Sequence, residues 1–263
     1  MDTGLSGKVA FVAAASKGLG RAIADSLAAE GAALAICARG EAQLESARAE
    51  LATRTTAPVH AVAADLATSE GIDRATRSVL ERFGRVDVLV TNAGGPPVGV
   101  FESLDWAVWQ RAVELTLRSA VEMTRAVLPG MRQRRWGRVL HITSLTVKQP
   151  IDGLMLSTSI RSAVTGFSRT LANEVAGDGI TVNTLLPGFM NTERVVELNE
   201  ATAAREGVAV DEVERRVRNQ IPMRRIGEPR ELAALATFLA SEHASYITGQ
   251  SIAVDGGWIR GLL

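Results

Sequence analysis

The sequence is poor in cysteine, tyrosine and lysine: its 263 residues include one, one and three of these. Because Cys37 is the only cysteine, a disulfide within the chain is excluded, which is typical of a reducing cytoplasm. Basic and acidic side chains number 29 each, so no net charge favours nucleic acid or an anionic membrane. The longest early apolar run, 9–15, is too short for a secretion signal or a membrane span. We therefore expect a cytoplasmic protein that binds neither nucleic acid nor membranes.

Apolar runs alternate with helical patterns along the chain, whose composition is 46% apolar and 22% charged. The apolar runs are nearly continuous, which is typical of strands covered by helices on both faces. Repeated strand–helix–strand units predict a single α/β domain over residues 1–263, built on a doubly wound parallel sheet. The expected strands are 8–15, 33–38, 58–63, 86–91, 138–143, 180–186 and 251–254, and the expected helices are 20–32, 41–53, 69–83, 104–134, 155–176 and 229–240.

The segment 188–224 departs from this alternation. It is polar, has a helical pattern, and is inserted between a predicted strand and the last predicted helix. Segments of this size in a compact domain are commonly lids or binding loops. We expect it to be a substrate lid, although its sequence does not identify the substrate.

The stretch AAASKGLG, residues 13–20, joins the first predicted strand to the first predicted helix. Glycines at such a turn, here Gly18 and Gly20, let the backbone approach a pyrophosphate that the helix N-terminus stabilises. A tight turn without a ligand is the simpler alternative. The position of the turn, after a strand and before a helix, favours a dinucleotide site.

The end of the second predicted strand indicates which dinucleotide is bound. A site for NAD usually places a carboxylate about 20 residues after the glycines, where it binds the ribose 2′-hydroxyl. This chain has Arg39 there instead, and Lys17 lies within the turn. Two cations suit a 2′-phosphate, so we expect NADP(H) rather than NAD(H). The alternative is that Arg39 is a solvated residue at a strand end.

Further motifs carry a resemblance to a known family. They are SKGLG (16–20), Asp65-Leu66, TNAG (91–94), Ser144, VNTLLPGFMNT (182–192), IPMRRIGEPRELA (221–233) and ITGQSIAVDGG (247–257). On these motifs the chain resembles the short-chain dehydrogenase/reductase family from about residue 7 to residue 257, and 3-oxoacyl-thioester reductases within it. The resemblance implies a Rossmann-type fold, a homotetramer or homodimer, and a small-molecule or acyl-carrier-bound carbonyl substrate.

The resemblance also implies a set of cofactor-binding residues and no metal. In the family, the positions of Asp65 and Leu66 flank the adenine, and those of Pro187, Gly188 and Thr192 approach the nicotinamide. The full expected set is Ala14, Ser16, Lys17, Gly18, Leu19, Gly20, Arg39, Asp65, Leu66, Asn92, Ala93, Gly94, Arg161, Pro187, Gly188 and Thr192.

The chain departs from the family pattern where catalysis takes place. The family active site normally offers Asn, Ser, Tyr and Lys, and the matching positions here are Thr116, Ser144, Ser157 and Arg161. We take these four as the candidate catalytic residues, of which only Ser144 keeps the family's residue type. The first glycine of the family's turn is Ala14 here, so the turn has to accommodate a Cβ.

The replacements remove the usual proton relay. A tyrosine whose pKa a neighbouring ammonium lowers can protonate an alkoxide, whereas the shorter and far less acidic hydroxyl of Ser157 is a poor acid. Arg161 can hold a ribose or an oxyanion, but it does not exchange protons near neutral pH. We therefore expect generic ketones to be reduced about 10²–10⁴-fold more slowly than with a full relay.

Few other residues can replace the missing acid. The only tyrosine, Tyr246, lies in a stretch that is structural in the family. Lys148 is a candidate cation or acid, or else a solvated loop residue. His141 lies on the same predicted strand as Ser144 but on its opposite face, so we expect it to be a packing residue. Asp152 is a candidate substrate contact that nothing else supports.

Three functions remain open at this point. The first is an NADPH-dependent oxidoreductase that reduces a ketone, a 3-oxoacyl thioester or a polyketide-like substrate. The second is a non-redox enzyme on the same fold, of the dehydratase or aldolase type. The third is a catalytically silent nucleotide-binding subunit. The cofactor motifs favour the first, whereas the missing tyrosine favours the other two.

Overall fold

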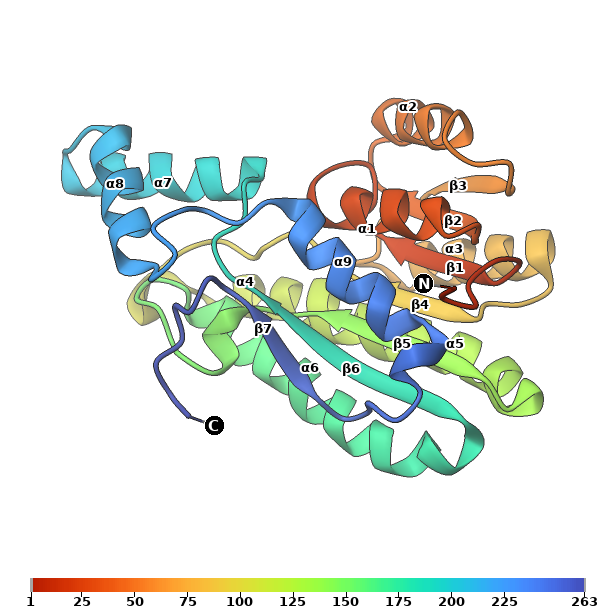
Figure 1. The fold of residues 1–263 in the computed structure, drawn as a ribbon. Helices are drawn as coiled ribbons and strands as arrows, with labels where there is room; N and C mark the ends of the chain where they lie inside the picture. Colours follow the sequence, from red (N-terminus) through yellow and green to blue (C-terminus); the bar gives the residue numbers. More distant parts are fainter. Residues whose placement is uncertain (1, 263) are drawn as a thin grey trace.

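Seven parallel strands form the central sheet of the computed structural model, which describes residues 2–262 (Figure 1). Their order across the sheet is β3-β2-β1-β4-β5-β6-β7. The chain therefore builds one half of the sheet outward from β1 and then returns to build the other half from β4, which creates a switch point between β1 and β4. The strands are β1 (Val9–Ala13), β2 (Ala33–Ala38), β3 (Val59–Ala63), β4 (Val88–Thr91), β5 (Gly137–Ile142), β6 (Ile180–Pro187) and β7 (Ser251–Val254).

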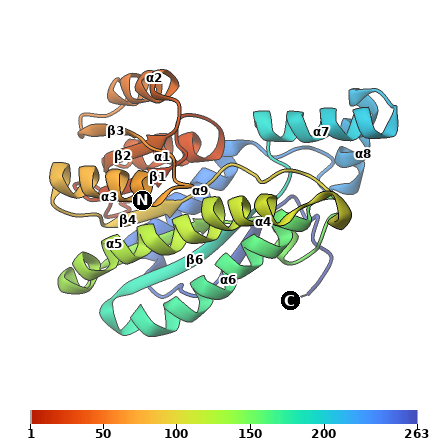
Figure 2. The same ribbon diagram turned by 180° about the vertical axis from the view of Figure 1, so that it is seen from behind.

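Helices cover both faces of the sheet. Figure 1 shows α1, α2 and α9 on one face, and Figure 2 shows α3, α4, α5 and α6 on the other. None of the described helices combines the length and the apolar character needed to cross a bilayer. The helices of these two layers are α1 (Gly18–Ala29), α2 (Glu41–Ala52), α3 (Ser69–Phe83), α4 (Trp106–Ala112), α5 (Ser119–Arg134), α6 (Met155–Val175) and α9 (Pro229–Ala240), with short 3₁₀ turns at Phe101–Ser103, Leu145–Val147, Ala176–Asp178 and Glu242–Ala244.

The strands divide their side chains between two apolar cores, one on each face of the sheet. In β1, Ala10 and Val12 pack in the core beneath α1 and α9. Phe11 and Ala13 pack in the core beneath α3, α5 and α6, because successive side chains of a strand point to opposite faces. Cys37 of β2 lies in this second core, where burial raises the pKa of its thiol to about 12. The doubly wound α/β fold predicted from the continuous apolar runs is confirmed.

The predicted elements agree with the structure to within about three residues at each end, but the predicted helix 104–134 has an unexpected interruption. It begins at Trp106, because the side chain of Asp105 accepts a hydrogen bond from the N–H of Val108 and caps the first turn. Between α4 and α5 the helix widens into a π-helical segment, η2 (Val113–Arg118). Such segments are rare and often lie at functional sites.

The segment 188–224 contains two helices, α7 (Glu193–Glu206) and α8 (Val210–Gln220). Figure 1 shows both helices beyond the carboxyl ends of the strands. The N–H of Asn191 donates to the carbonyl of Gly227 at 2.7 Å, and the N–H of Gly227 donates to the carbonyl of Phe189 at 2.9 Å. These bonds fix the start of the segment to the residues that precede α9.

Candidate active site

A cavity of about 1190 Å³ lies at the carboxyl ends of the parallel strands. Doubly wound sheets bind their ligands at this edge, next to the switch point in the strand order. The predicted site residues all line this cavity except Gly20, which is buried behind the turn, and Thr116, which is buried in η2. The fold therefore brings together residues that are more than 170 positions apart in the chain, such as Ser16 and Thr192.

The turn between β1 and α1 has the shape that a pyrophosphate site needs. Ala14 has φ 50°, in the left-handed region that glycine usually occupies, so the turn accepts its Cβ at the cost of backbone strain. A Cβ on Gly20 would lie 2.4 Å from the carbonyl oxygen of Ala14, so only glycine fits there. No side chain caps the N-terminus of α1, and the first residues of the helix, Gly18 and Leu19, line the cavity. Their free N–H groups can bind an anion.

The two cations predicted to bind a 2′-phosphate lie in different environments. Arg39 is exposed at the end of β2, lines the cavity, and has no carboxylate partner within residues 2–262. Lys17 lines the cavity as well, but its ammonium pairs with the carboxylate of Glu193 in the first turn of α7. Arg39 is therefore available to a phosphate, whereas the ammonium of Lys17 already pairs with Glu193 in the segment that follows β6.

Asp65 and Leu66, which the resemblance places beside the adenine, both line the cavity. Leu66 is buried at the cavity wall, and Asp65 accepts a hydrogen bond from the N–H of Ala67 at 3.0 Å, which holds its carboxylate in place. Residues 92–94 follow β4 and also line the cavity.

Ser144 follows β5 and lines the cavity with an ordered hydroxyl. Its Oγ accepts a hydrogen bond from the N–H of Thr146 at 3.2 Å and a second from the Thr146 hydroxyl at 3.0 Å. Both bonds use Ser144 as the acceptor, so its own proton is available to a ligand in the cavity. Thr146, which is almost fully buried, was not singled out by the sequence, since nothing in the residue pattern shows that it bonds back to Ser144.

Ser157 lies in the first turns of α6, lines the cavity and is partly exposed. No hydrogen bond from its hydroxyl to another residue in the range 2–262 is formed. The other candidate acids lie elsewhere: Tyr246 is fully exposed, Lys148 and Asp152 are exposed, and none of the three lines the cavity. The position of Lys148 agrees with the interpretation of a solvated loop residue.

Arg161 has a buried guanidinium that binds backbone carbonyls. Its Nη1 donates to the carbonyls of Ile142 and Thr143, both at 2.9 Å, and its Nη2 donates to the carbonyl of Ala93 at 3.5 Å. Burial, with a smaller contribution from the charge of Arg194, lowers the pKa of Arg161 to about 10. It is still a cation at neutral pH, and it ties the end of β5 to the loop that follows β4.

Thr116 lies in η2 and does not line the cavity. Its Oγ1 is buried and has no hydrogen-bond partner among the described residues. Buried hydroxyls are nearly always paired, so Thr116 is an exception among the described residues.

His141 is a packing residue, as expected from its strand position. Its ring is fully buried against Phe167 of α6, and Nδ1 lies 2.6 Å from the hydroxyl of Thr91. Burial lowers the pKa of His141 to about 4, so the ring is neutral at physiological pH. It does not line the cavity.

Arg194 is a cavity residue that the sequence did not identify individually, although it lies two positions after Thr192. It belongs to the first turn of α7, and its Nη2 donates to the carbonyl of Pro96 at 2.8 Å. A Cβ on Gly95 would lie 2.7 Å from the Nε of Arg194, so the missing side chain at Gly95 makes room for the guanidinium. The first turn of α7 thus contacts the loop after β4 through Arg194 and the turn after β1 through Glu193.

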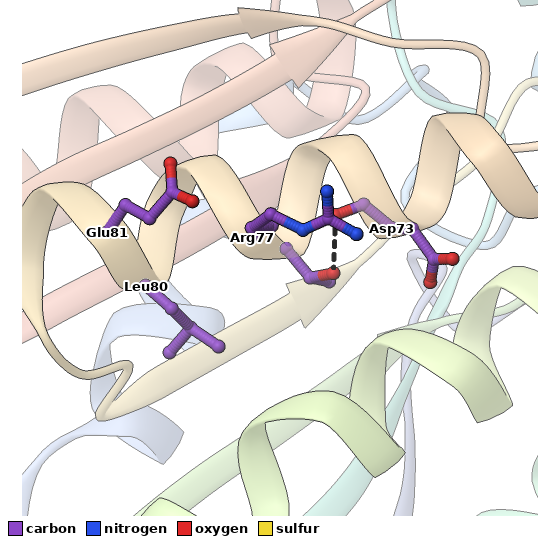
Figure 3. A pocket seen from close by; sticks show the side chains of 5 residues that line it. Asp73, Arg77, Leu80 and Glu81 are labelled. Atoms are coloured by element: carbon purple, nitrogen blue, oxygen red, sulfur yellow. Dashed lines mark hydrogen bonds between the residues drawn. The ribbon is translucent and has the colours of Figure 1, made fainter.

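A second hollow, of about 500 Å³, lies on the outer surface of α3 (Figure 3). All five of its lining residues come from this one helix, and the dashed line in the figure is the bond from the Thr76 hydroxyl to the Asp73 carbonyl. The hollow shares no lining residue with the cavity described above, and no second element contributes a side chain to it, so we do not regard it as a functional site. Within residues 2–262, no group of three or more His, Cys, Asp or Glu side chains is arranged to bind a metal ion.

Known proteins resemble this chain over practically its whole length. The family described as "Enoyl-(Acyl carrier protein) reductase" matches residues 13–259. The 3-oxoacyl-[acyl-carrier-protein] reductase FabG of Vibrio cholerae is 34% identical over 253 residues, covering 96% of this chain and 98% of its own. The D-beta-hydroxybutyrate dehydrogenase of Cupriavidus necator is 34% identical over 263 residues, covering 97% and 99%. The L-sorbose reductase of Gluconobacter frateurii, solved in complex with NADPH and L-sorbose, matches with a TM-score of 0.94 and 36% identity, covering 100% of both chains.

Proposed function

Because the chain belongs to the short-chain dehydrogenase/reductase family, we propose that it reduces a carbonyl compound with NADPH and uses a proton-donor arrangement of its own. One observation carries this proposal: Ser144 stands in the cavity with its Oγ saturated by two bonds from Thr146 and its proton free. A carbonyl oxygen that gains negative charge needs such a donor.

The cavity fits NADP(H) at three points. The uncapped N-terminus of α1 suits the pyrophosphate, Arg39 suits the 2′-phosphate, and Leu66 with Asp65 suits the adenosine. The solved L-sorbose reductase contains NADPH, which supports the same preference here. When bound, NADPH supplies the hydride that reduces the carbonyl carbon, and the remaining requirements fall on the side chains of this chain.

Ser144 and Arg161 stabilise the oxygen of the substrate in this proposal. The hydroxyl of Ser144 donates to the carbonyl oxygen. Arg161 binds the carbonyl of Thr143, the residue immediately before Ser144, so its positive charge lies beside the developing alkoxide. The guanidinium stays protonated and contributes charge only.

The proton of the product comes from water in this proposal. Ser157 has a hydroxyl in the cavity without a partner among residues 2–262, so it can hold a water molecule next to the substrate oxygen. Water is a weaker and less ordered acid than a tyrosine at the same position. The rate on generic ketones is therefore expected to be lower by about 10²–10⁴-fold.

The names of the relatives indicate the range of substrates to test. They act on 3-oxoacyl-[acyl-carrier-protein], D-beta-hydroxybutyrate and L-sorbose. We propose a ketone of this general kind, either free or attached to an acyl carrier, with the segment 188–224 acting as the lid that selects it.

The test follows NADPH consumption at 340 nm with a panel of ketones and 3-oxoacyl thioesters, for the wild type and for Ser144→Ala. Slow oxidation of NADPH that Ser144→Ala abolishes supports the proposal. NADPH binding without oxidation on any member of the panel contradicts it and favours the silent subunit. Loss of water from 3-hydroxyacyl thioesters, or cleavage of a carbon–carbon bond, without use of NADPH favours the non-redox enzyme.

A further inference from the structure

The cavity contains two arginines that bind the same short loop. Arg161, from α6, donates to the carbonyl of Ala93 at 3.5 Å, and Arg194, from α7, donates to the carbonyl of Pro96 at 2.8 Å. Both line the cavity. The two guanidiniums bond to carbonyls only three positions apart in the loop 93–96, and the charge of Arg194 acts on Arg161. Ser144 and Ser157 line the same cavity.

Arg161 is a buried cation without a carboxylate partner. Its side chain is buried, and its three assigned bonds all go to neutral carbonyls, so within residues 2–262 two of its five N–H groups have no acceptor. A buried charge without an opposite charge is unfavourable. The structure therefore contains a positive site that an anion would stabilise.

Arg194 adds a second positive charge that is only weakly neutralised. Its one acidic neighbour is Glu197, at 3.5 Å, and that carboxylate is mostly exposed to solvent. Two guanidiniums close together disfavour each other's charge, which agrees with the effect of Arg194 in lowering the pKa of Arg161.

The acidic residues that line the cavity are committed elsewhere. Asp25 pairs with Arg21 and Arg54, and Glu193 pairs with Lys17. Asp65 accepts a hydrogen bond from the backbone N–H of Ala67. None of the three forms an ion pair with Arg161 or Arg194.

The anions of the proposed cofactor have separate binding groups. The N-terminus of α1 is available to the pyrophosphate and Arg39 to the 2′-phosphate. The nicotinamide ribose, which Arg161 is also expected to hold, is uncharged, so the positive charge of the arginine pair is left for an anionic substrate.

We propose that the substrate is an oxo acid, whose carboxylate binds between Arg161 and Arg194 while its carbonyl oxygen meets Ser144. This inference rests on the proposed reductase function and narrows it from ketones in general to anionic ones. Carboxylates and guanidiniums form paired, charge-assisted hydrogen bonds, which a neutral ester or amide cannot match.

The experiment compares matched substrates that differ only in charge. These are 2-oxobutanoate, 3-oxobutanoate and 4-oxopentanoate, each with its methyl ester and its primary amide, so that the spacing between carboxylate and carbonyl is also varied. For at least one acid, kcat/KM should exceed that of its ester and its amide at least tenfold, mainly through KM. Equal or better turnover of the neutral partners overturns the inference and leaves the reductase function intact.

Arg194→Gln tests the assignment of the site. It should remove the preference for the acid while the Kd for NADPH changes less than about twofold. Arg125→Gln, an exposed position of α5 outside both the cavity and the segment 188–224, should leave the preference unchanged. If Arg194→Gln weakens NADPH binding as much as it weakens the acid, Arg194 binds the cofactor and the inference is wrong.

A binding measurement separates this inference from the reductase function. Calorimetry with NADP⁺ present compares 3-hydroxybutanoate with 3-hydroxybutanamide. If no carbonyl compound is reduced, tighter binding of the acid that Arg194→Gln abolishes still supports the anion site. Equal affinities for acid and amide overturn it.

Discussion

Thr146 donates two hydrogen bonds to Ser144, one from its backbone N–H and one from its hydroxyl. This relationship sets the direction in which the proton of Ser144 points. Thr146→Val keeps the shape of the side chain but removes the hydroxyl bond, so Ser144 loses part of its orientation. We expect kcat for ketone reduction to fall about tenfold with little change in KM, and Thr146→Ser to restore it. Steady-state kinetics at 340 nm checks this, and an unchanged kcat in Thr146→Val would show that Thr146 only packs.

Arg39 is expected to set the cofactor preference, because it replaces the carboxylate that selects NAD. NADPH should bind at least about tenfold tighter than NADH, a difference of ~1.4 kcal/mol, and Arg39→Asp should erase the difference. Calorimetry with both cofactors provides the measurement. Equal affinities in the wild type would contradict the assignment of Arg39.

The pairing of Lys17 with Glu193 predicts a second effect on the cofactor. Glu193→Gln removes the carboxylate that competes with the 2′-phosphate for Lys17. The affinity for NADPH should rise a few-fold while that for NADH stays the same, since the pair is exposed and exposed ion pairs are weak. A parallel rise for both cofactors would show that Glu193 acts on the cavity as a whole.

The double change Ser157→Tyr with Arg161→Lys should restore a phenol and an ammonium at their usual places in the family. Reduction of a simple ketone such as cyclohexanone should rise by about 10²-fold, the lower end of what general acid catalysis supplies. Ser157→Phe with Arg161→Lys is the matched control, since it adds the ring without the acidic hydroxyl. Arg161→Lys alone should be less stable, because an ammonium cannot make the three forked bonds to Ile142, Thr143 and Ala93. A folded double variant no faster than its control would show that the proton supply does not limit the rate.

The helices α7 and α8 are expected to move as a lid. In the absence of ligands, amides in 193–220 should exchange with deuterium faster than those of β1 and β5, and NADPH should slow them, because α7 contacts the loops on either side of the cavity. Hydrogen-exchange mass spectrometry with and without NADPH is the measurement. Equal protection of both regions under both conditions would rule out a lid.

The neutral, buried His141 predicts a loss of stability in acid. Its pKa is about 4 in the folded protein and about 6.5 in the unfolded chain, so the unfolded state binds the proton first as the pH falls. The stability contribution is complete above pH 6.5 and is lost between pH 6.5 and 4, by as much as about 3 kcal/mol. Urea unfolding at pH 7 and pH 5 should show a smaller loss in His141→Asn than in the wild type. His60→Asn is the control: burial lowers its pKa as well, but His60 is only partly buried, so this change should have a smaller effect.

The elements of this fold follow from local patterns, which is why the sequence predicted them. The five buried residues of β1 and the strand–turn–helix context of Gly18 and Gly20 are readable over fewer than 20 positions. The resemblance then placed Ser144, Ser157 and Arg161 at one cavity, as the structure has them.

The missed features depend on side chains that meet across the fold. Arg194 and Pro96 are 98 positions apart, and Lys17 and Glu193 are 176 positions apart, so no local pattern shows that they bond. The residues of the π-helical segment around Thr116 are ordinary helix residues, so the amino-acid composition does not reveal that the helix widens there. The sequence predicted that Lys17 binds the 2′-phosphate, but it does not show that Lys17 forms an ion pair with Glu193 of α7.

Because Cys37 is buried, the rate at which its thiol reacts reports how often the folded protein opens. Its thiol is the only one in the chain and is fully buried on β2, the second strand from one edge of the sheet, where burial raises its pKa to about 12. A soluble alkylating reagent can therefore modify it only when the core beneath α3, α5 and α6 opens, and with enough reagent to label faster than the core recloses, the labelling rate equals the rate of that opening. The mass of one added label, followed over time, would report the kinetic lifetime of the native sheet without any engineered probe, for the wild type and for each variant described above.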